Sequence, residues 1–142
     1  MNYTQELNEA IEAADEALYY LDKARQDLLS ARNWGIFDIF GGGMIATFIK
    51  RNKMSKAKSY VIDARESLMK LKNELDDIDD VIEFDLDMDD FLSFADYFFD
   101  NSFFSDLMVQ GRINNARSKI LEAIDNVKLI KEELQEELRN LY

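Results

Sequence analysis

Carboxylates spaced like the ligands of a calcium loop are the residues of this chain most suited to chemistry. Asp85, Asp87, Asp89 and Asp96 occupy positions 1, 3, 5 and 12 of the EF-hand pattern. Position 6, which requires Gly for a sharp turn, is Asp90, and position 12 is Asp in place of the bidentate Glu. An acidic linker that leads into a helix N-terminus explains the same residues. We therefore expect no metal site. The four aspartates are the candidate ligands of the calcium alternative.

The rest of the chain contains few residues suited to catalysis or cofactor binding. The chain contains no His and no Cys, which removes the commonest general base and the commonest intracellular nucleophile. The three glycines at 41–43 precede an apolar run and Lys50. A phosphate loop also needs a preceding strand and a Gly-Lys-Ser/Thr ending, and neither is present in the sequence. We predict that the protein is not an enzyme and binds no cofactor.

Charge is distributed unevenly along the chain. The net charge is −12, yet residues 50–72 hold eight Lys or Arg and two acidic residues. Residues 73–111 hold thirteen Asp or Glu and no Lys or Arg. An acidic molecule is repelled by nucleic acids and anionic membranes. We therefore expect a protein partner of basic character, no nucleic acid as a partner, and a homodimer as an alternative assembly.

The acidic segment is also rich in Phe, and we expect the partner surface there. Its residues are Asp87, Asp89, Asp90, Phe91, Phe94 and Phe98. Residues 89–100 place Asp on one face and Phe on the other face of a short amphipathic helix. Exposed rings beside carboxylates are typical of binding surfaces. The alternative is that all the rings complete the core.

Three apolar stripes with heptad spacing predict three long helices. They are Leu7, Ala10, Ala14, Ala17, Leu21, Ala24, Leu28 and Ala31; Met54, Ala57, Val61, Ala64, Leu68, Leu71, Leu75, Ile78 and Ile82; and Ile113, Ala116, Ile120, Ala123, Val127, Ile130 and Leu134. The pattern predicts a single all-α domain over residues 1–142. We expect an antiparallel helical bundle with coiled-coil packing, built from three long helices and one shorter helix, with two short helices at the turns.

A shift of 59 positions aligns part of the sequence with itself and indicates an internal repeat with units 36–82 and 95–141. Ala57 then falls on Ala116, and Ala64 on Ala123. Each unit would contain a short helix (44–51 or 103–110), a left-handed cap and a long helix. Asn52 and Gly111 are the predicted caps, because Asn and Gly accept left-handed backbone most readily.

The most apolar stretch, residues 34–49, is too short to span a bilayer, is interrupted by glycines and contains Asp38. We expect Trp34, Phe37 and Phe40 to cover the open end of the bundle. The polar, acidic residues 1–12 do not have the pattern of a signal peptide. These features favour a cytoplasmic protein without a membrane span.

One region resembles a recurring signature of uncharacterised bacterial helical proteins. The resemblance rests on Trp34-Gly35, Asp38, the glycines at 41–43, and Lys50 with Lys53. It covers about a seventh of the chain, implies a helical fold with a glycine-rich turn, and implies no known activity. The tryptophan turn is also similar to that of the small secreted WXG-type proteins, but here Gly35 follows Trp34 directly, so that family is not assigned.

The function that these features favour is that of a non-enzymatic interaction or scaffolding protein. Two alternatives remain open. One is a calcium- or lipid-responsive regulator. The aspartates would bind calcium in such a protein, and the apolar stretch 34–49 would contact lipid. The other is an acidic mimic of nucleic acid that occupies the basic site of a partner.

Overall fold

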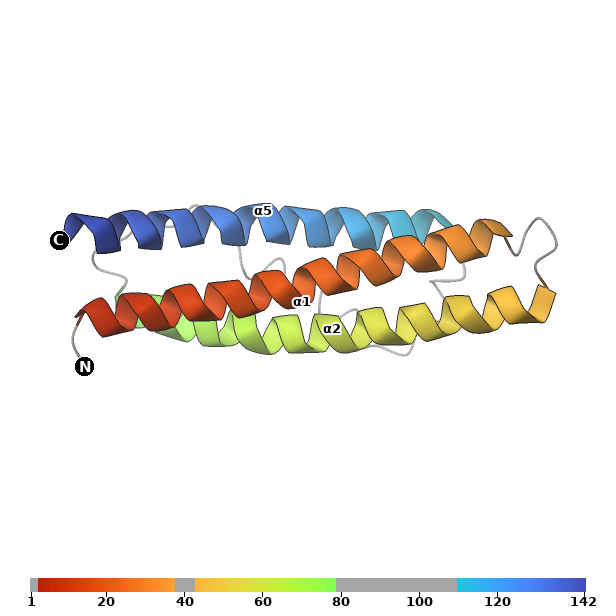
Figure 1. Cartoon of the computed structure of the whole chain (residues 1–142), viewed down its shortest axis with the longest axis horizontal. Coiled ribbons are helices and arrows are strands. Elements are labelled where there is room, and N and C mark those ends of the chain that lie inside the picture. The colour runs from red at the N-terminus through yellow and green to blue at the C-terminus, as the bar shows by residue number, and fades with distance from the viewer. Residues whose placement is uncertain (1–2, 38–42, 79–109) are drawn as a thin grey trace.

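The computed structural model describes residues 3–37, 43–78 and 110–142 of the chain, and they are helical almost throughout. Helix α1 spans Tyr3–Phe37, α2 spans Gly43–Asp77 and α5 spans Gln110–Asn140 (Figure 1). No strand occurs within these three ranges. The expectation of an all-α protein with three long helices is therefore confirmed. The shorter fourth helix predicted at 89–100 lies outside the described residues.

The heptad stripes form the core of the molecule. Every stripe residue whose burial the structure describes is at most 7% exposed, from Leu7 in α1 to Leu134 in α5. Burial of one Leu, Ile or Val side chain contributes about 1.5–3 kcal/mol. A helix of about ten turns therefore gains most of its stability from this one face rather than from intrinsic propensity. The predicted seams of all three helices are confirmed at these positions.

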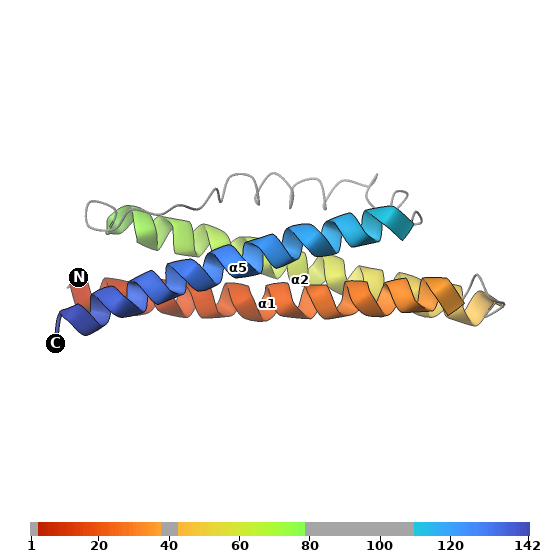
Figure 2. The ribbon, with the colours of Figure 1, turned by 90° about the horizontal axis from the view of Figure 1, so that it is seen from above.

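Helix α1 is the central element of the arrangement. It packs along both α2 and α5, whereas no comparable packing joins α2 to α5. Both neighbours run antiparallel to α1, so that they are parallel to one another (Figure 1, Figure 2). The C-termini of α2 and α5 consequently lie at the same end of the molecule as the N-terminus of α1.

Charged side chains complement the helix dipole at two of the six ends of these helices. Helix α1 carries Glu6 in its first turn, where a negative charge complements the helix dipole. Helix α5 carries Arg139 in its last turn, which is favourable for the same reason. Helix α2 has no basic residue in its last turn and ends on Asp76 and Asp77, which are unfavourable at a negative helix end. It stops at Asp77, where the Ile78 amide donates to the Leu75 carbonyl at 3.1 Å.

The predicted left-handed caps are wrong. Asn52 lies inside the continuous helix α2, and Gly111 lies in the first turn of α5. The short helix expected at 44–51 is the first part of α2 rather than a separate element. Asn costs well under 1 kcal/mol in a helix interior, and without a Pro the apolar periodicity carries the helix through this position. The repeat of short helix, cap and long helix is thus absent from its first unit; most of the short helix expected at 103–110 lies outside the described residues.

Two further expectations concern the apolar region of residues 34–49. The capping layer of Trp34, Phe37 and Phe40 lies outside the side chains that the structure describes. None of the helices α1, α2 and α5 contains a stretch that is both long and apolar enough to cross a membrane.

Candidate functional site

The residues predicted to form a site lie outside the described part of the chain. This holds for the candidate metal ligands Asp85, Asp87, Asp89 and Asp96, and for the partner surface of Asp87, Asp89, Asp90, Phe91, Phe94 and Phe98. Among the residues that are described, no cluster of three or more carboxylates is arranged to hold a metal ion. The structure shows instead the charged surfaces of the helices that precede and follow this segment.

Acidic side chains converge where the end of α2 meets the start of α1. Burial raises the pKa of the Glu74 carboxyl, and the nearby charges of Glu9, Asp77 and Glu6 raise it further. Lys70 opposes this effect but does not cancel it. One carboxylate oxygen of Glu74, Oε2, is buried without a hydrogen-bond partner. The ionised form of Glu74 therefore destabilises the α1–α2 contact.

This geometry predicts that Glu74→Gln stabilises the protein at pH 7. The pKa of Glu74 is higher in the folded chain than its ordinary value, so its ionisation weakens the fold as the pH rises above about 4.5. Removal of one unpaired, partly buried charge should raise the free energy of unfolding by about 0.5–1 kcal/mol. Thermal denaturation followed by circular dichroism at pH 7 and at pH 4 measures the effect.

The difference between Glu74→Gln and the natural chain should shrink at pH 4, where Glu74 is largely protonated in both states. Glu136→Gln removes the same charge from an exposed position of α5 and serves as the control. An equal gain in both variants, or a gain that persists undiminished at pH 4, would contradict the assignment.

The ionisation of Asp22 acts in the opposite direction to that of Glu74. Arg25 lowers the pKa of the Asp22 carboxyl, so the associated stability is lost as the pH falls below about 3.8.

The same end of the molecule joins α1 to α5 through Tyr3. Its hydroxyl donates a hydrogen bond to Glu137 Oε1 at 3.0 Å. Burial raises the pKa of Tyr3 to about 12, and the hydrogen bond to Glu137 and its charge add to the effect. The phenol therefore stays protonated throughout the physiological range and fixes the first turn of α1 against the last turns of α5.

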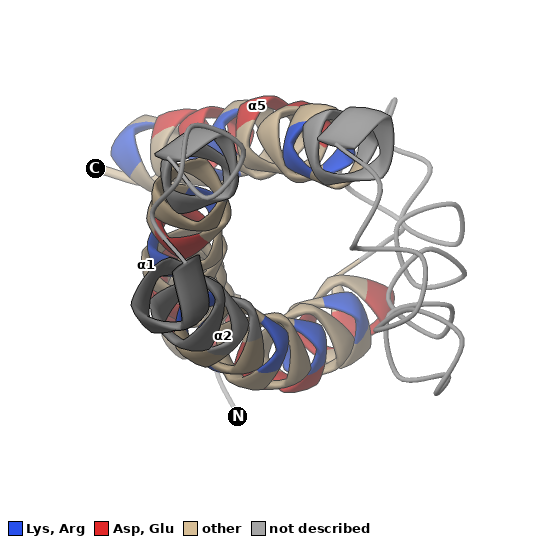
Figure 3. Ribbon diagram, turned by 90° about the vertical axis from the view of Figure 1, so that its right-hand side faces the viewer, with Lys and Arg blue, Asp and Glu red and all other residues tan. Residues whose placement is uncertain are grey.

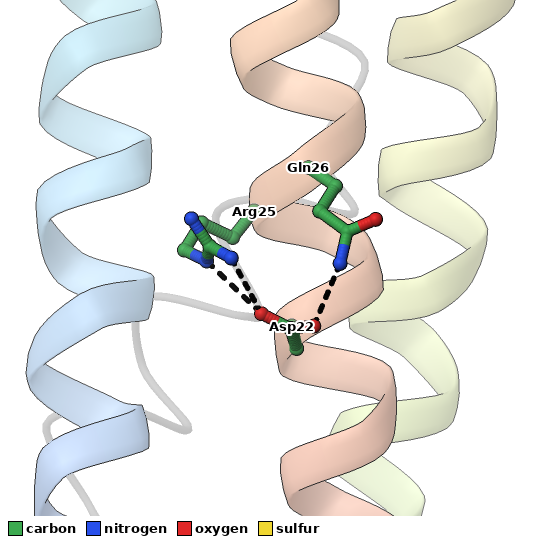
Figure 4. A network of polar contacts seen from close by, with 3 residues as sticks. All are labelled: Asp22, Arg25 and Gln26. Carbon is green, nitrogen blue, oxygen red and sulfur yellow. Dashed lines mark hydrogen bonds and ion pairs between the residues drawn. The ribbon is translucent and has the colours of Figure 1, made fainter.

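Ion pairs fix the register of α1 against both of its neighbours. Lys131 Nζ lies 2.6 Å from Asp15 Oδ1 across the α1–α5 contact, and Lys53 Nζ lies 4.0 Å from Asp27 Oδ1 across the α1–α2 contact. Within α1, Asp22 accepts hydrogen bonds from Arg25 and Gln26, which flank it on opposite sides (Figure 4). Such partly exposed pairs contribute about 0–1 kcal/mol each, so they set the register more than the stability.

An open groove of about 230 Å³ lies between α1 and α2. Its lining consists of Glu16 and Tyr20 from α1, and Asp63, Glu66, Ser67 and Lys70 from α2. Carboxylates outnumber the single amine, so the lining favours cationic over anionic groups. Ser67 is buried. The sequence pattern alone does not identify this groove, since its lining depends on which residues of α1 face α2.

Basic residues recur along the length of α2, as the end-on view shows (Figure 3). The Lys and Arg residues of the stretch 50–72 therefore all lie within one helix rather than in a loop. The segment that follows α2 carries the opposite charge. The charge of the sequence therefore changes sign near the end of α2.

No protein-family model, curated protein or solved structure matches the chain. This result is consistent with the resemblance of residues 33–53 to proteins of no known function.

Proposed function

We propose that this chain is a non-enzymatic interaction or scaffolding protein of the cytoplasm that binds a basic protein partner through its acidic and aromatic segment. The observation that carries the proposal is the separation of charge at the end of α2. Residues 50–72 have a net charge of +6, whereas residues 73–111 contain thirteen carboxylates and no compensating cation. A surface with this field attracts and orients a basic partner.

The described helices support this reading as a scaffold. Their apolar stripes are buried in one common core, and ion pairs hold α1 in register with α2 and α5. The acidic segment 79–109 is inserted between the end of α2 and the start of α5. A binding segment that is anchored at both ends loses less conformational entropy on association than a free tail does.

The proposal predicts that the combined changes Asp87→Asn, Asp89→Asn and Asp90→Asn weaken the binding of the partner without unfolding the protein. The three changes remove negative charge and retain side-chain size. The partner, isolated by affinity purification from the source cells, should bind the triple variant about tenfold less tightly in low salt, since steering and rim charges depend on ionic strength. Titration calorimetry at several salt concentrations should show that the affinity of the triple variant depends less on salt concentration than the affinity of the natural chain does.

A matched control separates local recognition from net charge. Glu132, Glu133 and Glu136 are exposed on α5, and their replacement by Gln changes the net charge by the same amount. At 0.15 M salt this control should leave the affinity within about twofold, because charges more than a Debye length of about 8 Å from an interface are largely screened. Equal losses for both variants, or no loss for the aspartate variant, would place the partner surface elsewhere.

A further inference from the structure

The groove between α1 and α2, here called the α1–α2 groove, combines an aromatic ring, a hydroxyl and three carboxylates. Its lining consists of Glu16, Tyr20, Asp63, Glu66, Ser67 and Lys70. Its volume of about 230 Å³ is below the roughly 300–1,000 Å³ that is typical of sites for drug-sized molecules. The groove therefore has the size for a single side chain rather than for a whole cofactor.

The carboxylates of the α1–α2 groove are not neutralised by partners within the described helices. Among the described residues, Glu16, Asp63 and Glu66 take part in no ion pair and no side-chain hydrogen bond. Lys70 is the only cation among the described lining residues. Burial raises the pKa of Glu74 one turn further along α2, and Lys70 partly offsets that rise, so its charge is shared between two sites. The groove therefore attracts a cation from outside.

Tyr20 brings an oriented aromatic ring to the groove. It packs against the hydrophobic core, and its ring meets the Tyr19 ring edge to face, with centroids 5.3 Å apart and an interplanar angle of 77°. The Tyr19 ring already has a cation of its own, because Lys23 Nζ lies 5.6 Å from its centroid. Within the described part of the chain, no cation lies over the Tyr20 ring. A cation that enters the groove therefore has the Tyr20 ring as its aromatic partner.

Ser67 adds a buried hydroxyl to this lining. It is 5% exposed and is the only buried polar or charged residue among those that the structure describes. Its hydroxyl makes no hydrogen bond to another described side chain. A hydroxyl accepts hydrogen bonds from N–H donors, so the groove offers such a donor an acceptor besides the carboxylates.

We propose that the α1–α2 groove binds an arginine side chain of the basic protein partner. A guanidinium is planar and has five N–H donors, so it stacks on the Tyr20 ring while it donates hydrogen bonds to the carboxylates and to the Ser67 hydroxyl. The lysine ammonium is compact, strongly hydrated and not planar, so it fits this set of groups less well. The arginine contact rests on the proposed basic partner and gives that partner a second contact, on the described helices, besides the acidic and aromatic segment.

A titration with a synthetic peptide tests the groove directly. Acetyl-tetra-arginine amide is added to the ¹⁵N-labelled full chain at physiological salt, and the backbone amide signals are followed by NMR. Within the described helices, the largest changes should occur at residues 16–20 and 63–70, which include the groove lining. The affinity obtained from these signals should be about threefold higher than for acetyl-tetra-lysine amide, because only the guanidinium stacks on the ring.

A carboxylate variant tests the charged part of the lining. The combined changes Glu16→Gln, Asp63→Asn and Glu66→Gln retain side-chain size and should weaken the arginine peptide about fivefold at the groove signals, since charge-assisted hydrogen bonds are lost. Replacement of the exposed Glu132, Glu133 and Glu136 of α5 by Gln changes the net charge equally. This control should leave the affinity within about twofold, because distant charges are screened.

A pair of tyrosine variants tests the aromatic part. Tyr20→Leu should remove the preference for arginine over lysine, whereas Tyr19→Leu, at the neighbouring exposed position, should retain it. Circular dichroism checks that each variant is helical. The carboxylate variant alters no core residue, so its result stands even if Tyr20→Leu lowers the stability.

Three results would overturn the arginine site. They are signal changes confined to residues 79–109, equal losses in the carboxylate variant and its control, and equal affinities for the two peptides. None of them contradicts the proposed function, which is tested with the natural partner and the variant of Asp87, Asp89 and Asp90. Conversely, a failure of that variant to weaken the partner would leave the changes at residues 16–20 and 63–70 as evidence for the groove.

Discussion

Leu71→Asp should abolish the folded state or come close to it. Leu71 is fully buried in the seam of α2, within the core that α1 and α2 share. The described core residues are apolar, and burial of an ionised carboxylate among apolar side chains costs at least about 4 kcal/mol. Domains of this size have about 5–15 kcal/mol of total stability. Urea unfolding followed by the helical circular dichroism signal should therefore show little or no cooperative transition.

The matched control for this substitution is Leu129→Asp. Leu129 lies on the outward face of α5 and is 58% exposed, so the new charge stays in water and the expected change is within about 0.5 kcal/mol. A cooperative transition in Leu71→Asp similar to that of the control would show that α2 does not pack through its predicted seam.

The second large effect is expected from Ala17→Leu. Ala10, Ala13, Ala14, Ala17 and Ala24 are all fully buried on α1, the helix that packs against both neighbours. Small side chains here allow the helix axes to approach toward the short end of the 8–10 Å range. A larger side chain has to displace a neighbouring helix, which costs about 1–3 kcal/mol. The melting temperature should fall by roughly 2–4 °C per kcal/mol.

Glu12→Leu provides the comparison for this experiment. Glu12 is exposed on the same helix, and the change introduces the same side chain with a high helix propensity. It should leave the melting temperature nearly unchanged. If Ala17→Leu were neutral or stabilising, the core beside α1 would contain unfilled space, and the close approach inferred from the alanines would be wrong.

Periodicity was sufficient to determine the long helices and the face that each of them buries. Seams such as Leu7 to Ala31 could be predicted because a 3–4 spacing keeps apolar residues on one side of any α-helix, whatever its neighbours are. The charge division at the end of α2 is likewise a property of the sequence, and it underlies the proposed partner surface. Whether residues 87–98 form that surface stays a prediction, since they lie outside the described part of the chain.

The local preferences of Asn52 and Gly111 gave the wrong prediction of left-handed caps. Both residues accept left-handed backbone, but that tolerance is a weak signal, and a continuous helix with a buried seam outweighs it at Asn52. The proposed repeat depended on both caps, so continuity of α2 through Asn52 removes its first unit. A sparse set of identities between two heptad helices reflects their common period more readily than a common plan.

The tertiary structure decided which elements meet. Heptad stripes on three helices look alike, so nothing in the sequence identified α1 as the helix that packs against both others. The same applies to Glu74, whose raised pKa arises from its burial and from Glu9 and Glu6, more than sixty residues away in the chain. Periodicity fixes which face of a helix is apolar, whereas the choice of neighbour depends on long-range packing that no local pattern encodes.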